Sequence, residues 1–367
     1  MRLIAALMLL ATPAAAQRFD FRPGPGQFSV ALPEGNYRVT VTLGDPARAS
    51  ETTIKAEDRR LMLDAVTVPR GRTVTRSFVV NIRNARLAPP PANAPGGTAV
   101  RLKPREQGAL TWDDELTLEI LGDRAALTAL TVEPATVPTL FLLGDSTVTD
   151  QPAEPAASWG QMLPALFGDG IAIANHAESG ETLKSFLTEL RLDKVLSLVK
   201  PGDWAAIQFG HNDQKANWPQ THAPAATTWR DYLRTYIAEF RRRGVHPILV
   251  TSPERRNWTG PRIRPTLSDY ADAARVVATE KGVPLLDLNA ASIAHNEAVG
   301  PDRAPLTFND NGKDATHHNN YGAWVLARAV AGGIADARLP LARHLRSDLA
   351  AFDPARPPAP ETFRLAP

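Results

Sequence analysis

The 367-residue chain contains no cysteine, no marked excess of one charge and no long apolar segment. The absence of cysteine excludes disulfide bonds, a lipid-modified N-terminal cysteine and cysteine-ligated metal sites. The formal net charge is only +2, from 41 basic and 39 acidic residues, so neither nucleic acid nor a membrane surface is an expected partner. The apolar stretch near the N-terminus, Leu3 to Leu10, is far shorter than the roughly 20 residues of a membrane-spanning helix.

The first 16 residues have the pattern of a secretory signal peptide. Arg2 supplies a short positive region, the apolar stretch follows, and Ala14 to Ala16 form a cleavage motif of small residues. We expect cleavage near Ala16, so that the mature protein begins near Gln17 and lies in the periplasm or outside the cell. A membrane anchor is the alternative, and the shortness of the apolar stretch argues against it. No membrane insertion is expected after cleavage.

The first part of the mature chain has the alternation that is typical of β-strands. With 43% hydrophobic and 22% charged residues, the composition is that of a globular protein long enough for two domains. Between residues 18 and 133, short alternating runs are separated by turns rich in Gly and Pro. Examples are "NYRVTVTL" (36–43), "TVTRSFVVNIR" (73–83) and "ELTLEIL" (115–121). The pattern predicts an antiparallel β-sandwich domain, for which carbohydrate binding is a candidate role.

After Pro138, strand-like runs alternate with amphipathic helical segments. Strands are predicted at 140–143, 171–175, 204–209, 248–251 and 284–288, and helices at 229–243, 267–281 and after Asn319. Such alternation predicts a three-layer α/β domain with a parallel sheet over residues 138–340. The Pro-rich tail, residues 341–367, either wraps this domain or is loose.

Polar motifs follow the predicted parallel strands, at the sheet edge where ligands bind in such folds. The motif "GDST" (144–147) comes directly after the first strand and contains the candidate nucleophile Ser146. Asp314 and His317 come from one turn, in "DATHHNNYGAW". Their spacing lets the carboxylate accept a hydrogen bond from Nδ1 of His317 and leaves the other ring nitrogen to face the serine. The three residues therefore predict a Ser-His-Asp catalytic triad.

Three hydrogen-bond donors are candidates for an oxyanion hole. Asn212, in "QFGHNDQK", offers its side-chain NH2 group, and Gly180, in "NHAESGETLKSF", offers its backbone N–H. Ser146 offers its own backbone N–H, which we expect at the start of a helix, where the helix dipole adds to it. Donors in such positions stabilise the negative charge that develops on a carbonyl oxygen under attack.

Other interpretations of these motifs stay open. Each motif alone is compatible with a turn or a helix cap, and a metal site would group Asp145, Asp314, His317 and His318. A serine hydrolase with an oxyanion hole needs no metal and no other cofactor, so we expect none. Asp145 is then structural and holds the nucleophile turn. We expect His318 to be a solvated neighbour of His317, and His295 to lie on the surface.

In combination, the motifs resemble the serine, glycine, asparagine and histidine blocks of the SGNH (GDSL) hydrolase superfamily. More narrowly, "LGDSTVTD", "RLDKVL", "KPGDWAAIQFGHNDQK" and "DATHHNNYGA" resemble the rhamnogalacturonan acetylesterases of carbohydrate esterase family 12. The resemblance covers about residues 138–335 and implies a flavodoxin-like order of the parallel sheet. One departure is Glu181, because that family usually has an Arg directly after the oxyanion glycine.

The resemblance implies a secreted serine esterase that removes acetyl groups from pectic rhamnogalacturonan. Alternatives are another acetylated glycan such as xylan, a lipase- or thioesterase-like substrate, and a non-catalytic carbohydrate-binding protein. Arg255, Arg256, Trp258 and Trp218 lie in predicted rim loops. The arginines are candidates either for clamping a uronate carboxylate or for solvated turn positions. The tryptophans are candidates for stacking on sugar rings or for packing beneath loops.

Overall fold

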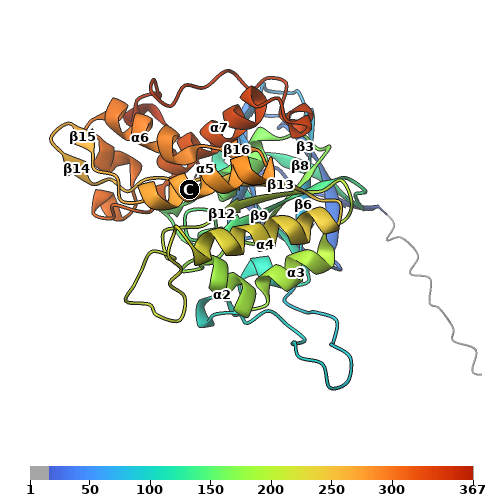
Figure 1. The fold of residues 1–367 in the computed structure, drawn as a ribbon. Coiled ribbons are helices and arrows are strands. Elements are labelled where there is room, and N and C mark those ends of the chain that lie inside the picture. The colour runs from blue at the N-terminus through green and yellow to red at the C-terminus, as the bar shows by residue number, and fades with distance from the viewer. Residues whose placement is uncertain (1–15, 367) are drawn as a thin grey trace, which may run out of the picture.

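A computed structural model of the chain describes residues 16–366, so the predicted signal peptide, apart from Ala16, lies outside the described residues. The five predicted strands of the second half form a parallel sheet (Figure 1). They are β9 (Thr139–Gly144), β11 (Ala172–Asn175), β12 (Trp204–Gln208), β13 (His246–Val250) and β16 (Leu285–Leu286). Their order is β11-β9-β12-β13-β16, which is the flavodoxin-like order that the resemblance implies.

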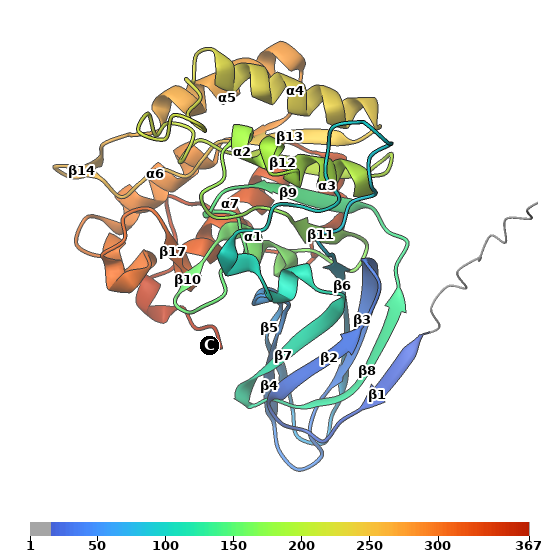
Figure 2. The ribbon, with the colours of Figure 1, turned by 90° about the horizontal axis from the view of Figure 1, so that it is seen from below.

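Helices cover both faces of this parallel sheet, as the three-layer prediction requires. They are α1 (Trp159–Met162), α2 (Leu183–Thr188), α3 (Arg191–Leu198), α4 (Thr228–Arg242), α5 (Ser268–Lys281), α6 (Leu288–Val299) and α7 (Asn320–Asp336). The apolar faces of α2 to α5 form one core with the sheet. Those of α1, α6 and α7 form a second core on the opposite face (Figure 2).

Strand β9, which precedes Ser146, is buried along its whole length. Leu140 and Leu142 point into the core beneath α1 and α7, whereas Phe141 and Leu143 point into the core beneath α2 to α5. A parallel strand that is covered on both faces reads as a continuous apolar run, which is why this strand was predictable. The end of β9, and hence the start of the nucleophile turn, is therefore fixed by two cores.

The N-terminal half forms two antiparallel sheets that pack face to face (Figure 2). One sheet has the order β1-β8-β3-β6 and the other β2-β7-β4-β5. The strands are β1 (Gln17–Asp20), β2 (Gly26–Ala31), β3 (Gly35–Leu43), β4 (Ser50–Ala56), β5 (Arg60–Val68), β6 (Val74–Ile82), β7 (Glu115–Arg124) and β8 (Leu127–Pro134). Val39 and Val41 from one sheet share a core with Ile54 and Leu118 from the other, which is a sandwich arrangement.

The expected separation of this sandwich from the catalytic half is wrong. Strand β6 pairs in parallel with β11 at Val80 and Ile173, so the β1-β8-β3-β6 sheet and the parallel sheet are one nine-stranded sheet. A buried ion pair, from Arg60 Nε to Asp150 Oδ2 at 2.6 Å, also joins the two halves. Alternation within strands cannot reveal this continuity, because it says nothing of which strand pairs with which. The predicted domain limits, 18–133 and 138–340, stay predictions.

A long connection between β6 and β7 reaches from the sandwich to the catalytic half. It carries two short 3₁₀ helices, at Pro104–Glu106 and Leu110–Trp112. Its backbone contacts the helices on one face of the parallel sheet, because Arg101 N–H donates to the Glu189 carbonyl at 3.0 Å and Lys194 Nζ donates to the Arg86 carbonyl at 2.8 Å. Figure 2 shows this connection passing alongside α3.

Two short antiparallel pairs complete the strands. They are β10 (Ala156–Ala157) with β17 (His318–Asn319), and β14 (Trp258–Thr259) with β15 (Arg262–Ile263). The Pro-rich tail wraps the catalytic half, since Leu341 is fully buried and the Tyr321 hydroxyl of α7 donates to the Pro358 carbonyl at 2.6 Å. No helix between residues 16 and 366 is both long and apolar enough to cross a membrane.

Candidate active site

Ser146 lies in a tight turn directly after β9, at the carboxyl edge of the parallel sheet. The N–H groups of Val148 and Thr149 donate to the Asp145 carbonyl at 3.0 and 3.1 Å. A Cβ at Gly144 would lie 2.9 Å from the Gln208 carbonyl oxygen, so this approach of two strand ends requires glycine. No helix begins here, because α1 starts only at Trp159. The expectation that a helix dipole acts on the Ser146 N–H is therefore wrong.

Asp145 is buried and holds the nucleophile turn, as predicted. Its Oδ1 accepts hydrogen bonds from the Thr147 N–H at 2.9 Å and from Thr147 Oγ1 at 2.8 Å. Its Oδ2 lies 3.3 Å from Nδ1 of His211. Burial alone would raise the pKa of Asp145, but the interactions with His211 and Thr147 outweigh burial and lower it. The carboxylate is thus a charged anchor beneath Ser146.

The structure brings Ser146, His317 and Asp314 together in one chain of hydrogen bonds. Ser146 Oγ lies 2.8 Å from Nε2 of His317, and Nδ1 of His317 lies 2.7 Å from Oδ2 of Asp314. Ser146 is only 8% exposed, so its neighbours shield it from solvent. This is the nucleophile, base and orienting carboxylate geometry that acyl transfer by serine requires.

Asp314 is kept ionised by the turn that carries it. Its Oδ1 accepts hydrogen bonds from the backbone N–H groups of Thr316 at 2.7 Å and of His317 at 3.0 Å. Burial alone would raise the pKa of Asp314, but these bonds and the contact with the His317 ring together lower it. A charged carboxylate at Nδ1 fixes the ring tautomer that leaves Nε2 able to accept the serine proton.

Two contacts fix the histidine loop against the rest of the site. Strand β10, which follows the Ser146 turn, pairs with β17, and Ala157 lies opposite His318. Arg256 holds the other side of the loop: its NH2 donates to the Gly312 carbonyl and, at 3.4 Å, to the Asp314 carbonyl. The geometry of the triad thus depends on distant segments, since Ser146 and His317 are 171 positions apart in the chain.

The loop that carries Gly180 lies against the nucleophile turn. The Glu178 N–H donates to the Gly144 carbonyl at 3.1 Å, and Thr149 Oγ1 donates to the Ala177 carbonyl at 2.8 Å. Gly180 has φ +81°, a left-handed conformation that glycine adopts without strain. The local backbone therefore explains why a glycine stands at this position.

Asn212 is oriented toward the same loop. Its Nδ2 donates to the Glu181 carbonyl at 3.1 Å, and its Oδ1 accepts a hydrogen bond from Nζ of Lys215 at 2.7 Å. The amide has a second N–H that neither contact uses. The structure thus brings the loops of the candidate oxyanion donors, Ser146, Gly180 and Asn212, to one edge of the sheet.

Glu181, the departure from the related family, is fully buried and paired within a charged cluster. Lys103 Nζ contacts its Oε1, Arg191 Nε lies 3.5 Å from Oε1, and Ser185 Oγ donates to Oε2 at 2.7 Å. The carboxylate therefore does not face the substrate side, and its charge is balanced by Lys103, which comes from the N-terminal half.

The two arginines proposed for substrate binding support loops in this structure. Arg255 donates to Thr266 Oγ1 and to the His211 carbonyl, each at 3.2 Å. Arg256 holds the histidine loop, and its guanidinium lies 5.2 Å from the centre of the Phe308 ring. Because both guanidinium groups donate to protein atoms, the geometry favours loop support over a carboxylate clamp.

The two tryptophans differ from each other. Trp218 is 39% exposed, and the ammonium group of Lys215 lies 3.8 Å from the centre of its ring. Trp258 lies in β14, is half-buried, and its indole N–H is buried without a partner. Only Trp218 therefore presents a large apolar surface to solvent, and one of its faces is taken by Lys215.

Two histidines expected at the surface are buried. His318 is 2% exposed and packs on Phe308 with ring centres 4.5 Å apart. Burial is the largest cause that lowers the pKa of His318 to about 3, and burial lowers the pKa of His295 to about 4. Both expectations were wrong because a histidine next to a polar motif gives no sign of whether its ring points inward.

The residues of the metal alternative lie in three different environments. Asp145 faces His211, whereas Asp314 faces His317, and His318 packs on Phe308. Within residues 16–366, no three His, Asp or Glu side chains are grouped as ligands for a metal ion.

Sequence reasoning missed two residues that hold the Gly180 loop. Lys103 Nζ donates to the Ser179 carbonyl at 2.8 Å, and Arg105 Nε donates to Glu178 Oε1 at 2.7 Å. Both lie in the connection between β6 and β7, outside the motifs of the catalytic half. No periodicity or motif marked "KPRE" (103–106) as part of the site, because its partners lie more than 70 residues away.

Comparison with known proteins identifies related esterases. The model of the GDSL-like lipase/acylhydrolase family matches residues 142–325. The chain is 38% identical over 222 residues to the rhamnogalacturonan acetylesterase RhgT of Bacillus subtilis, covering 57% of this chain and 94% of that protein. It is 26% identical over 224 residues to a rhamnogalacturonan acetylesterase of Emericella nidulans, covering 56% of this chain and 88% of that protein.

A likeness that reaches into the N-terminal half is also found. The crystal structure of YxiM from Bacillus subtilis superposes with a TM-score of 0.53 at 26% identity, covering 86% of this chain and 81% of that one. YxiM is described as an uncharacterized esterase. The family model spans half of this chain and includes Ser146 and His317. The chain therefore belongs to the GDSL-like lipase/acylhydrolase family, is an SGNH hydrolase that resembles rhamnogalacturonan acetylesterases, and is a carboxylic ester hydrolase.

Proposed function

We propose that this protein is a secreted serine acetylesterase that removes acetyl groups from a polysaccharide, and that the polysaccharide is pectic rhamnogalacturonan. The observation that carries the proposal is the unbroken chain of hydrogen bonds from Ser146 through His317 to Asp314. The names of the curated relatives support the acetyl group and the polymer. The signal-peptide pattern supports action in the periplasm or outside the cell, where such a polymer is found.

The first half of the reaction transfers the acetyl group to the enzyme. His317 Nε2 accepts the proton of Ser146 Oγ as the oxygen attacks the acetyl carbonyl carbon. The tetrahedral intermediate collapses, the bond from carbon to the sugar oxygen breaks, and His317 returns the proton to that oxygen. The sugar leaves with a free hydroxyl, and an acetyl-serine ester remains. Asp314 stabilises the imidazolium that exists between the two proton transfers.

The oxyanion is stabilised by donors on three loops. In this proposal the N–H groups of Ser146 and Gly180 and the free N–H of Asn212 point at the carbonyl oxygen as its charge develops. Loss of one such donor costs about 2.7–4 kcal/mol of transition-state stabilisation in a well-studied serine hydrolase. The contacts of Asn212 with Glu181 and Lys215 hold the amide before substrate arrives.

The second half releases acetate. A water molecule gives a proton to His317 and attacks the acetyl-serine carbonyl carbon. The intermediate collapses to acetic acid, and Ser146 Oγ recovers its proton from His317. Every proton is carried by His317, so the cycle is expected to run without a metal and to survive treatment with EDTA.

Acetate release from a panel of polymers tests the proposal. Wild-type protein is expected to release acetate fastest from acetylated rhamnogalacturonan, more slowly from acetylated xylan, and to hydrolyse p-nitrophenyl acetate. Ser146→Ala is expected to reduce every rate to the background, because no other nucleophile is present in the chain of hydrogen bonds. If acetate were released faster from acetylated xylan, xylan would replace rhamnogalacturonan as the proposed substrate. A fully active Ser146→Ala protein would refute the mechanism.

A further inference from the structure

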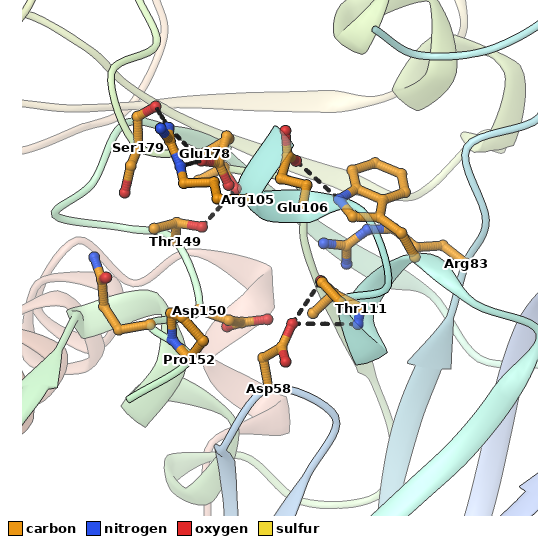
Figure 3. A pocket seen from close by; sticks show the side chains of 14 residues that line it. Asp58, Arg83, Arg105, Glu106, Thr111, Thr149, Asp150, Pro152, Glu178 and Ser179 are labelled. Atoms are coloured by element: carbon orange, nitrogen blue, oxygen red, sulfur yellow. Dashed lines mark hydrogen bonds and ion pairs between the residues drawn. The ribbon is translucent and has the colours of Figure 1, made fainter. Parts of the chain in front are cut away.

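A cavity of about 190 Å³ lies between the N-terminal half and the loops of the active site (Figure 3). Its N-terminal wall contains Asp58, Arg83, Trp112 and neighbouring residues of the connection between β6 and β7. Its other wall consists of residues 149–152, after the nucleophile turn, and 177–179, before Gly180. The cavity is therefore built by both halves of the chain.

Arg83 is the unusual group in this cavity. It is 3% exposed, and neither its Nε nor its NH1 has a hydrogen-bond partner. Its guanidinium lies 4.5 Å from the centre of the Trp112 ring, and Figure 3 shows it directed toward the cavity. Burial lowers the pKa of Arg83 to about 10, so it remains a cation at neutral pH. A buried guanidinium with unused N–H groups is costly unless an acceptor occupies the space that it faces.

The other cations around the cavity already have anionic partners. Arg60 pairs with Asp150 at 2.6 Å, and Arg105 pairs with Glu178 at 2.6 Å. Among the described residues of the cavity wall, Arg83 and Asp58 make no ion pair. Asp58 Oδ2 accepts only from Thr111, whose N–H and Oγ1 lie at 3.3 and 2.8 Å. One donor and one acceptor group thus face the same cavity without a charged partner.

We propose that the cavity is a sugar-binding subsite, in which hydroxyl groups of one neutral pyranose residue accept from Arg83 and donate to Asp58. The proposal rests on the function proposed above and adds a place for a sugar residue beside the acetylated one. A hydroxyl suits the pair because it accepts and donates at once. A uronate carboxylate suits it less well, since it would face the carboxylates of Asp58 and Asp150.

The position of the cavity beside the reacting serine supports this role. Gln151 lines the cavity, and its Nε2 donates to the Ser146 carbonyl at 2.8 Å. On the other side, Ser179 lines the cavity and directly precedes Gly180. A sugar residue in the cavity would therefore contact both loops that present groups to the acetyl ester.

The test compares a substrate that has a sugar chain with one that has none. For wild type, Arg83→Gln and Asp58→Asn, kcat/KM is measured on acetylated rhamnogalacturonan oligosaccharides and on p-nitrophenyl acetate. We expect the ratio of the two values to fall about tenfold or more in each variant, mainly through a higher KM on the oligosaccharide. Arg86→Gln is the matched control: Arg86 lies in the same connection, is exposed and pairs with Asp114, so both values should remain at the wild-type level.

The outcomes separate the subsite from the proposed function. An unchanged ratio would refute the subsite, whether both values fall equally or neither falls. Equal losses on both substrates would show that Arg83 acts only by supporting the fold. If wild-type protein hydrolyses p-nitrophenyl acetate but releases acetate from no oligosaccharide, the proposed function fails, and the subsite with it. If Arg83→Gln does not fold, Asp58→Asn decides the question, because Asp58 is half-buried and the replacement keeps its shape.

Discussion

At the scale of single residues, the partners of Glu181 determine how its buried charge is balanced. It occupies the position where related acetylesterases usually have Arg, but here it is buried among Lys103, Arg191 and Ser185. We expect Glu181→Arg to destabilise the fold by about 3–5 kcal/mol, because it would replace the carboxylate that Lys103 and Arg191 contact with a third buried cation. Urea unfolding followed by circular dichroism measures this, with Glu181→Gln as the milder variant. A wild-type unfolding midpoint for Glu181→Arg would show that the cluster rearranges easily.

His318 makes the stability of the fold depend on pH. Its folded pKa of about 3 lies below the ordinary value near 6.5, so the unfolded chain binds more protons between these values. The stabilising contribution is fully present above pH 6.5 and is lost as the pH falls toward 3; buried His295, at about 4, acts in the same direction. We expect His318→Phe to flatten the decrease of Tm between pH 6.5 and 4. The exposed His246, changed to Gln, is the control, and an identical slope in wild type and His318→Phe would contradict the prediction.

At the scale of elements, the site is assembled by loops that other loops hold. The histidine loop depends on Arg256, whose guanidinium contacts the carbonyls of Gly312 and Asp314 and the ring of Phe308. We expect Arg256→Ala to lower kcat about tenfold on both acetylated rhamnogalacturonan and p-nitrophenyl acetate, because the charged hydrogen bonds that position Asp314 are lost. A loss confined to the uronate-containing polymer would instead support the carboxylate clamp considered from the sequence.

At the scale of the whole molecule, the two halves share a sheet, a cavity and buried ion pairs. If the β-sandwich predicted from the sequence were a separate domain, a chain beginning near Glu133 would remain active on small esters. The structure argues for the opposite result, because removal of β6 exposes an edge of β11 and leaves Asp150 buried without Arg60. We expect the shortened chain to be insoluble or inactive on p-nitrophenyl acetate.

A second variant tests the same contact without removing the N-terminal half. Arg60→Met in the whole chain leaves the buried Asp150 without its cation, and we expect it to lower stability by about 3–5 kcal/mol. Thermal unfolding and soluble yield are the measurements. Full activity in the shortened chain, together with wild-type stability of Arg60→Met, would show that the N-terminal half is an independent unit after all.

The sequence by itself determined the features that depend on local pattern. The period of apolar residues located the five parallel strands and the helices α4, α5 and α7. The spacing of Asp314 and His317, with Ser146 directly after a buried strand, identified three side chains that the structure joins at 2.7 and 2.8 Å. The structure agrees with these elements and with this proximity because burial on both faces of a strand, and a bond between residues three apart, follow from a few neighbouring residues.

Only the tertiary structure decided which distant residues meet. The pairing of β6 with β11, the contact of Lys103 with Glu181, and the cavity between Arg83 and Asp58 join segments separated by tens of residues. Nor did any pattern show that His318 points inward or that Arg256 holds a loop. The partner of a charged or polar side chain is set by the path of the whole backbone. The sequence gives the charge and size of each side chain, but the fold determines which residue becomes its hydrogen-bond or ion-pair partner.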